Sequence, residues 1–354
     1  MARAMIAMSG GVDSSVAAYL MKEAGYDCAG VTMKLFENED AGVSRAKTCC
    51  SLEDVEDARS AAYRLGMKHY VFNFTEDFRR CVMEKFARSY AGGVTPNPCI
   101  DCNRFMKFDK LLQRAEVLGY DVLATGHYAQ ISEIDGQYVL KKAADKAKDQ
   151  SYVLYMLTQA QLSRIRFPLG NLLKAQVRWT AARLDLCNAQ KPESQDICFV
   201  PDGDYAAAVE RISGRAFADG DFVTADGCVV GRHKGIIRYT IGQRKGLGIA
   251  SSEPYYVCGV RPAENTVLLG RENELYRAEA DVDSFNWISG CAPQSPLRCK
   301  VKLRYRQPEQ PVTVIPTSDN SVHLLFDESQ RAVTPGQAAV LYDGDVVLGG
   351  GTIV

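Results

Sequence analysis

The sequence predicts an α/β N-terminal domain built on a parallel sheet, followed by two smaller β-rich parts. In the first half, short apolar runs alternate with helix-patterned segments, which is typical of strand–helix–strand units. The apolar runs cover residues 4–8, 28–35, 68–74 and 120–125. After about residue 205 the pattern changes to short β-rich stretches with turn signals such as Asp226-Gly227 and Asp343-Gly344, which favour hairpins and a small barrel or sandwich.

These changes of pattern predict three domains, at residues 1–204, 205–285 and 286–354. The chain has 354 residues, of which 46% are hydrophobic and 24% charged, so it can bury more than one core. Its first residues contain no basic segment followed by a long apolar one, and no run is long enough to span a bilayer. We therefore expect a cytoplasmic protein without a membrane contact.

Charge and cysteine content narrow the possible functions. The net charge is -1, so the chain has no global basic field for nucleic acid, and any RNA contact must come from local patches. The 12 cysteines form no compact disulfide framework. In a reducing compartment we expect most of them to be buried or chemically active thiols.

The stretch "AMIAMSGGVDSSVAAYL" predicts a phosphate-binding loop between a strand and a helix. Gly10 and Gly11 let the backbone approach an anion, while the helix N-terminus and the hydroxyls of Ser14 and Ser15 supply donors. The loop lacks the Gly-Lys-Ser/Thr ending of a Walker loop. A plain turn that caps a helix is the alternative. The stretch resembles the PP-loop of ATP pyrophosphatases, which implies adenylation with release of pyrophosphate.

A CxxC pair, Cys99 and Cys102 in "TPNPCIDCNR", allows three interpretations. A zinc site would need about two more ligands, and the nearest dense thiols are the adjacent Cys49 and Cys50. A thioredoxin-like pair would lie at a helix N-terminus, whereas the two prolines are expected to hold this loop extended just before a helix. The third interpretation pairs the loop with a distant thiol such as Cys198, in the polar stretch "KPESQDICFVPDGDY".

Eight ordered motifs together resemble the bacterial tRNA-specific 2-thiouridylase family and cover almost the whole chain. The motifs are SGGVDSS, TPNPCxxCN, ATGHYA, KDQSYVLY, FPLG, KPESQDICF, YTIGQRKGLGI and VTPGQAAVLYDGDVVLGGGTI. The resemblance implies a PP-loop (adenine nucleotide alpha hydrolase-like) catalytic domain, a central β-rich domain that contacts tRNA, and a C-terminal β-barrel that binds tRNA. It implies ATP-dependent exchange of oxygen for sulfur at C2 of the wobble uridine.

The resemblance also assigns roles to residues. It makes Cys102 the nucleophile and Cys198 the carrier of a persulfide, and it implies ATP with Mg²⁺. The positions that match the family's ATP contacts are Ala7, Met8, Ser9, Gly10, Gly11, Val12, Asp13, Ser14, Met33 and Gly126. The positions that match its tRNA contacts are Asn97, Cys99, His127, Lys148, Asp149, Gln150, Arg304, Tyr305 and Gln337. A structural histidine is the alternative for His127.

The implied partners are tRNAs for Lys, Glu and Gln, and a cysteine desulfurase or sulfur-carrier protein as sulfur donor. We expect a monomer. The rivals are a PP-loop ligase acting on a small molecule, which would not need Cys102 or Cys198, and a tRNA-binding module without catalysis.

A basic row is expected near the C-terminus, independently of the family. In "RCKVKLRYRQ" five cations share one parity, so a strand would direct all of them to one face. These cations are Arg298, Lys300, Lys302, Arg304 and Arg306. Such a row suits a phosphate track, and a solvated strand face is the alternative.

At Cys99 the sequence departs from the Asp that some members of the family carry in an NPD loop. Two hypotheses follow. Cys99 is an auxiliary thiol that resolves a disulfide with Cys102, or Cys99, Cys102 and Cys198 ligate a [4Fe-4S] cluster whose fourth iron binds sulfide. The persulfide route is favoured, because three ligands are one short of a closed cluster site.

Overall fold

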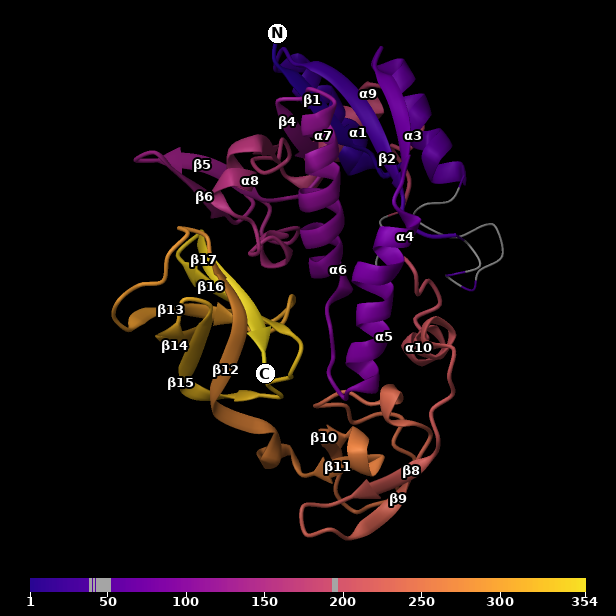
Figure 1. Ribbon diagram of the computed structural model, residues 1–354, viewed down its shortest axis with the longest axis vertical. Coiled ribbons are helices and arrows are strands. Elements are labelled where there is room, and N and C mark those ends of the chain that lie inside the picture. Colours follow the sequence, from indigo (N-terminus) through magenta and orange to yellow (C-terminus); the bar gives the residue numbers. More distant parts are fainter. Residues whose placement is uncertain (38–39, 41, 43–51, 193–196) are drawn as a thin grey trace.

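The computed structural model describes residues 1–37, 40, 42, 52–192 and 197–354. Figure 1 shows three parts along the long axis: an α/β part around the N-terminus, a small β part at the opposite end, and a barrel beside the helices that join them. Among the described residues, no helix is long and apolar enough to cross a membrane.

The N-terminal part contains a five-stranded parallel sheet in the order β3-β2-β1-β4-β7. Its strands are β1 (Arg3–Ala7), β2 (Asp27–Lys34), β3 (Lys68–Asn73), β4 (Val122–Thr125) and β7 (Ile165–Arg166). The first four coincide with the apolar runs expected from the sequence. The predicted parallel α/β sheet is therefore confirmed.

Both faces of the sheet are covered at its central strands, which explains why β1 and β4 are largely apolar, whereas the edge strand β3 is mostly exposed. On β1, Ala4 and Ile6 join one hydrophobic cluster and Met5 joins another, because successive side chains of a strand point to opposite faces. The first cluster packs under α1 (Val12–Glu23), α3 (Leu52–Arg64) and α9 (Lys174–Arg183). The second packs under η2 (Cys102–Leu111) and α7 (Leu112–Val117).

A pair of long helical segments runs from the sheet toward the central β part (Figure 1). One consists of α4 (Thr75–Phe78), η1 (Arg79–Met83) and α5 (Glu84–Ala91), and the other of α6 (Pro98–Asp101), η2 and α7. η1 and η2 are π-helices. Aromatic side chains of the first segment, Phe78 and Phe86, pack edge-on against Phe199. This third cluster joins the helices to the chain that follows residue 197.

The central part begins with α10 (Tyr205–Ser213) and holds a four-stranded sheet in the order β10-β11-β8-β9. Its strands are β8 (Gly220–Val223), β9 (Val229–His233), β10 (Tyr256–Arg261) and β11 (Thr266–Gly270). Short 3-10 helices lie at η4 (Ile236–Arg238), η5 (Pro262–Glu264) and η6 (Glu272–Leu275). The expected β-rich texture after residue 205 is thus observed.

The C-terminal part is a six-stranded antiparallel barrel. The strand order is β12-β15-β14-β13-β16-β17, and pairing of β12 with β17 closes it. The strands are β12 (Tyr276–Trp287), β13 (Leu297–Lys302), β14 (Gln310–Ser318), β15 (Ser321–Arg331), β16 (Ala338–Asp343) and β17 (Val346–Ile353). The predicted boundary at residue 285 falls inside β12. The predicted fold class, a parallel sheet followed by a β part and a barrel, is confirmed.

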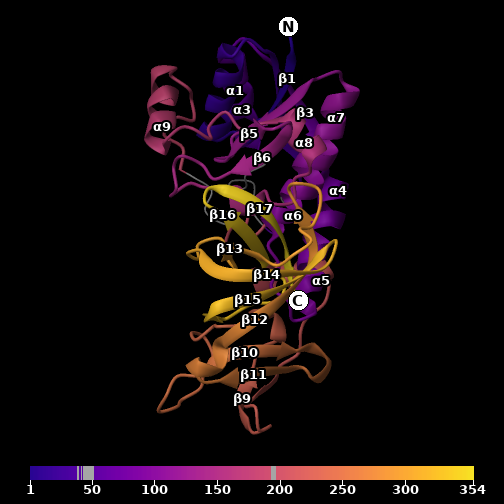
Figure 2. The ribbon, with the colours of Figure 1, turned by 90° about the vertical axis from the view of Figure 1, so that its left-hand side faces the viewer.

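A hairpin of the N-terminal part extends the barrel sheet. β5 (Gln130–Ile134) and β6 (Gln137–Lys141) pair with each other, and Lys141 pairs with Val346 of β17. Figure 2 shows this hairpin above β16 and β17. The neighbouring Lys142 and Glu309 form a largely buried ion pair of 2.6 Å. Helix α8 (Gln159–Arg164) and the 3-10 turn η3 (Ser151–Val153) complete this junction, which ties the barrel to the sheet.

Candidate active site

The loop Ser9–Val12 lies at the carboxyl end of β1 and leads into α1. Gly10 has φ +74°, and a side chain there would collide with the backbone of Asp54. Gly11 caps the helix without any side-chain hydrogen bond. The first N–H groups of α1 have no partner within the helix, which suits them to bind an anion.

The two serines that follow hold the loop together. Ser14 donates to the carbonyl of Gly11 at 2.9 Å and accepts from the amide of Ser9 at 3.2 Å. Ser15 donates to the same carbonyl, and Asn188 donates to both Ser15 and the carbonyl of Gly10 at 2.9 Å. The sequence suggested these hydroxyls as phosphate donors, but both bond within the protein. Their role toward a phosphate stays a prediction.

Asp13 faces two partners that the sequence analysis missed. Lys174 Nζ lies 2.7 Å from both carboxylate oxygens of Asp13, and the hydroxyl of Tyr128 donates to one of them at 2.7 Å. Lys174 is buried and opens helix α9. Its only signal in the sequence was a lone lysine after the apolar FPLG stretch. The pair places one cation and one carboxylate beside the loop.

The fit of this site to Mg²⁺ rests on that single carboxylate. Mg²⁺ in ATP enzymes keeps several waters and is bound by substrate phosphates plus one or two carboxylates. In the described part of the chain no three His, Cys, Asp or Glu side chains are arranged to hold a metal ion. The site therefore suits an ion carried by ATP phosphates with Asp13 nearby, and offers no metal cage of its own.

The adenosine-side candidates lie on strands next to β1. Gly126 follows β4, and a Cβ atom there would lie 2.8 Å from the backbone nitrogen of Ser14, so only glycine allows this approach. Met33 lies near the end of β2 and packs against two of the hydrophobic clusters. Because carboxyl ends of parallel strands meet at one edge, the structure brings Met33 and Gly126 to the edge that carries the loop.

The CxxC pair lies in a helix, which corrects the extended loop predicted from the prolines. Pro98 is the first residue of α6, where proline is tolerated because its missing N–H would be unpaired. Asn97 caps this helix by accepting from the amide of Cys99 at 3.2 Å. Cys99 is exposed, whereas Cys102, one turn later, is partly buried.

Cys102 and Cys198 pack against the same hydrophobic cluster as Phe78, Phe86 and Phe199. The two thiols, 96 positions apart in the chain, thus both pack against one cluster. Residues 193–196 of the KPESQDICF motif, and Cys49 and Cys50, lie outside the described residues. No three-ligand metal group exists among the described residues, and the alternative iron–sulfur cluster at Cys99, Cys102 and Cys198 stays a hypothesis.

Charges around Cys102 act in opposite directions. Burial raises the pKa of the Cys102 thiol, the ammonium of Lys107 lowers it, and the carboxyl of Asp101 raises it. Asp101 is itself buried, which raises its pKa, and Lys85 contacts it at 2.6 Å. Burial outweighs the ammonium, so the pKa of the Cys102 thiol is raised overall and the resting thiol is protonated near neutral pH.

His127 is buried at the end of β4, next to Gly126. Its Nδ1 lies 2.6 Å from Thr125 Oγ1, and its Nε2 lies 3.5 Å from Lys107 Nζ. Burial and the Lys107 charge hold the pKa of His127 well below its usual value, so the ring is neutral near pH 7. Because Lys107 only donates, the Nδ1–H tautomer pointing to Thr125 satisfies both contacts.

The predicted tRNA contacts at residues 148–150 lie in a loop held by internal hydrogen bonds. Asp149 accepts from the amide of Ala143 and from the hydroxyl of Ser151. Gln150 accepts from the amide of Tyr128 at 2.9 Å, and Tyr305 donates to the carbonyl of Asp149 at 3.0 Å. The structure thus brings Lys148, Asp149, Gln150 and Tyr305 together across two domains.

Arg304 and Gln337 also bridge parts of the molecule. Arg304 donates to the carbonyls of Ile241 and Ala332 and to the hydroxyl of Thr334, the shortest at 2.7 Å. The Gln337 amide donates to the carbonyl of Thr95. Both side chains therefore connect the barrel to neighbouring segments in this conformation.

The expected five-cation strand is wrong in its extent. β13 ends at Lys302, so Arg304 and Arg306 lie beyond it in a bend and turn. Arg298 forms a double hydrogen bond with Asp327 at 2.6 and 2.7 Å. Charged and uncharged residues continue to alternate after Lys302, but the backbone is no longer a strand there. Of the five cations, Lys300 and Lys302 lie within β13 and do not take part in the pair with Asp327.

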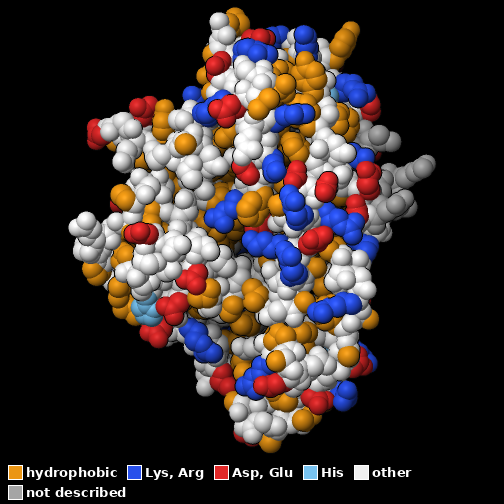
Figure 3. Space-filling view, viewed as in Figure 1, with side chains coloured by type: hydrophobic (Ala, Val, Ile, Leu, Met, Phe, Trp, Pro, Cys, Tyr) orange, Lys and Arg blue, Asp and Glu red, His pale blue; other side chains and the backbone are white. Residues whose placement is uncertain are grey.

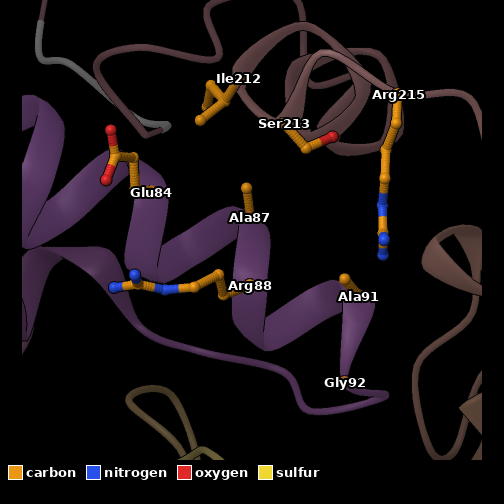
Figure 4. A pocket seen from close by; sticks show the side chains of 8 residues that line it. All are labelled: Glu84, Ala87, Arg88, Ala91, Gly92, Ile212, Ser213 and Arg215. Carbon is orange, nitrogen blue, oxygen red and sulfur yellow. The ribbon is translucent and has the colours of Figure 1, made fainter.

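Basic side chains also gather elsewhere on the surface. In Figure 3, Lys and Arg side chains lie along the helix side of a hollow between the barrel and the helices α5 and α6. A separate hollow of about 510 Å³ lies between α5 and the end of α10 (Figure 4). It is lined by Glu84, Ala87, Arg88, Ala91, Gly92, Ile212, Ser213 and Arg215. None of the predicted site residues lines this second hollow.

Three family models match successive parts of the chain. They are the tRNA methyl transferase HUP domain at residues 2–202, the tRNA methyl transferase PRC-barrel domain at 209–271, and the aminomethyltransferase beta-barrel domain at 277–353. Curated relatives match over nearly the full length. The tRNA-specific 2-thiouridylase MnmA of Acetivibrio thermocellus is 48% identical over 354 residues, covering 99% of each chain.

Two further relatives carry the same name. The tRNA-specific 2-thiouridylase MnmA of Clostridioides difficile is 47% identical over 99% of this chain and 98% of its own. That of Lachnoclostridium phytofermentans is 46% identical over the whole of both chains. An anion loop, a pair of thiols on one cluster and these full-length matches lead to one conclusion: the chain belongs to the tRNA-specific 2-thiouridylase family.

Proposed function

We propose that this protein catalyses ATP-dependent 2-thiolation of the wobble uridine of tRNA. The observation that supports the proposal is a series of contacts that connects the anion loop to the helix carrying Cys102. Gly126 touches the anion loop at Ser14, His127 follows it, and Lys107, on the helix of Cys102, reaches His127. These contacts support a nucleotide site next to the segment that carries Cys102. A ligase for small molecules would not need the thiols.

The first step would activate the uracil carbonyl. O2 of the base attacks the α-phosphorus of ATP, and pyrophosphate leaves from the backbone amides of the loop and the ammonium of Lys174. Mg²⁺, when bound with ATP, shares the charge of the phosphates. The oxygen is then part of an adenylate and can leave as AMP.

The second step would deliver sulfur. A desulfurase or carrier places a terminal sulfur on Cys198 as a persulfide, and this sulfur attacks C2 while AMP leaves with the original oxygen. The Cys102 thiolate then attacks the Sγ atom of Cys198 and releases the thiouridine sulfur, leaving a Cys102–Cys198 disulfide. Cellular thiols reduce this disulfide. In an alternative order, Cys102 attacks the persulfide first and releases sulfide, which attacks C2.

Recognition of tRNA would combine the loop at Lys148–Gln150 with the barrel. The wobble base lies in a single-stranded loop, so extruding it costs only a few kcal/mol. Asn97, Cys99 and His127 are proposed to face the target base, and Tyr305 and Gln337 the surrounding tRNA. The proposed substrates are tRNAs for Lys, Glu and Gln.

Mass spectrometry of tRNA nucleosides tests the function. The protein is incubated with ATP, cysteine, a cysteine desulfurase and unmodified tRNA for Glu, with a tRNA lacking a wobble uridine as control. We expect 2-thiouridine only in the former, with one pyrophosphate released per base modified. Pyrophosphate release without thiouridine would favour the ligase, and tRNA binding without either product would favour the binding module.

A further inference from the structure

Lys107 is a half-buried lysine between two candidate site residues, and no role has been assigned to it so far. It lies on the π-helix η2, which begins at Cys102. A π-helix closes its backbone hydrogen bonds between residues five apart, so Cys102 and Lys107 lie near one face. In an α-helix of 3.6 residues per turn these positions would point well apart. The unusual helix therefore brings the ammonium and the thiol to the same side.

The charge of Lys107 is not cancelled within the described part of the chain. Its ammonium contacts His127 at 3.5 Å, and that ring is neutral. The neighbouring lysines differ, since Lys85 pairs with Asp101 at 2.6 Å and Lys110 with Asp77 at 3.4 Å. An uncompensated cation in a partly buried site acts strongly on a nearby ionisable group.

Among the groups around the Cys102 thiol, Lys107 is the main positive charge that stabilises the thiolate. Asp101 precedes Cys102 and opposes ionisation of the thiol, but Lys85 from α5 neutralises it. Arg104 acts on Asp101 from the same helix. Burial works against the thiolate, and only the thiolate is nucleophilic.

We propose that Lys107 is a positioning residue that favours ionisation of Cys102 against the effect of burial, using the π-helix to set its ammonium on the side of the thiol and beside the neutral ring of His127. The inference rests on the proposed function in taking Cys102 as the nucleophile. The bond between Lys107 and His127 fixes the direction of the ammonium. Lys107 thereby also links the thiol to the end of β4, where Gly126 contacts the anion loop.

The test is the pH profile of alkylation at Cys102, read peptide by peptide with iodoacetamide and mass spectrometry. In the full-length Lys107→Met protein we expect the profile to move to higher pH and the rate at pH 7.5 to fall about tenfold. Lys107→Arg keeps the charge and should restore the profile. Lys110→Met removes the same charge from the same helix and should leave it unchanged.

Equal profiles for Lys107→Met and Lys110→Met would overturn the inference. Alkylation of Cys198 in the same samples serves as internal control, since a general loosening of the fold would accelerate both thiols. If Lys107→Met does not fold, Lys107→Gln keeps a donor for His127 and must show the same upward move. The alkylation assay contains neither ATP nor tRNA. If the parent protein thiolates tRNA but Lys107→Met leaves the pH profile of Cys102 unchanged, only this inference is refuted. If Lys107→Met shifts the profile but the parent protein does not thiolate tRNA, only the proposed function is refuted.

Discussion

The side-chain amide of Gln337 donates a hydrogen bond of 2.9 Å to the backbone carbonyl of Thr95. The amide of Thr95 in turn donates to the carbonyl of Pro335 at 3.1 Å. These two bonds join the barrel to the segment that leads into Cys99 and Cys102. The barrel therefore holds the thiol segment in place through these bonds.

Replacing Gln337 by alanine should loosen this segment. Loss of one hydrogen bond costs about 1 kcal/mol, which corresponds to about fivefold faster local opening. Hydrogen exchange of peptides covering residues 95–103 measures it. Gln307→Ala is the matched control, because Gln307 bonds to Gln330 within the barrel. Equal exchange in the two variants would show that Gln337 does not hold the segment.

Replacing either Cys102 or Cys198 by alanine should abolish 2-thiouridine formation while ATP–pyrophosphate chemistry with tRNA survives in part. The reason is that both thiols act after adenylation in the proposed sequence. Cys81 packs against the same hydrophobic cluster, so Cys81→Ala controls for lost packing and should stay active. Full thiolation by either site variant would remove that thiol from the mechanism.

The sequence predicted the parallel sheet and the loop after β1 because both depend on local patterns. An apolar strand, glycines and a helix start lie within a few residues of one another. Lys174 and Asn188 were missed because they reach the loop from 161 and 178 positions away. Only the tertiary fold makes these residues neighbours.

The errors near Cys99 and Lys302 have a different cause. Two prolines favour extended backbone before a helix, but Pro98 is instead the first helical residue, where its missing N–H costs nothing. After Lys302 the alternation of charges continues although the strand ends. Periodicity reports which residues could share a face, and it does not report where the backbone turns.

Lys302 lies in β13 and Arg304 lies beyond its end, so different effects are expected from two cations that the sequence analysis placed in one row. Lys302→Ala should reduce the salt dependence of tRNA binding by roughly one unit of log–log slope. Arg304→Ala should instead lower stability by about 2 kcal/mol, because it leaves carbonyls and a hydroxyl without their donor. Filter binding across salt concentrations and thermal unfolding separate the effects. Equal slopes for Lys302→Ala and the parent protein would show that this strand face does not bind phosphates and is an ordinary solvated face.

Lys174 should matter for the nucleotide step. Lys174→Met leaves Asp13 without its cation beside the phosphates, so we expect pyrophosphate release to slow by about tenfold, with a higher KM for ATP. The double variant Asp13→Asn with Lys174→Met removes the unpaired charge and tests stability apart from catalysis. If Lys174→Met lowers Tm but keeps the KM for ATP, the lysine supports only the fold.

Cys99 distinguishes the persulfide route from a cluster. Because Cys99 is exposed on the first turn of α6 while Cys102 is partly buried one turn later, Cys99 suits a thiol that would open the proposed Cys102–Cys198 disulfide to external reductants. We expect Cys99→Ala to keep measurable thiolation with a strong dithiol reductant and to slow with a weak monothiol. Cys99→Ser provides the isosteric control and should behave alike. Iron-free protein purified in air should also turn over once reduced. Anaerobic protein with about four irons per chain, inactivated both by chelation and by Cys99→Ala, would instead make all three cysteines ligands.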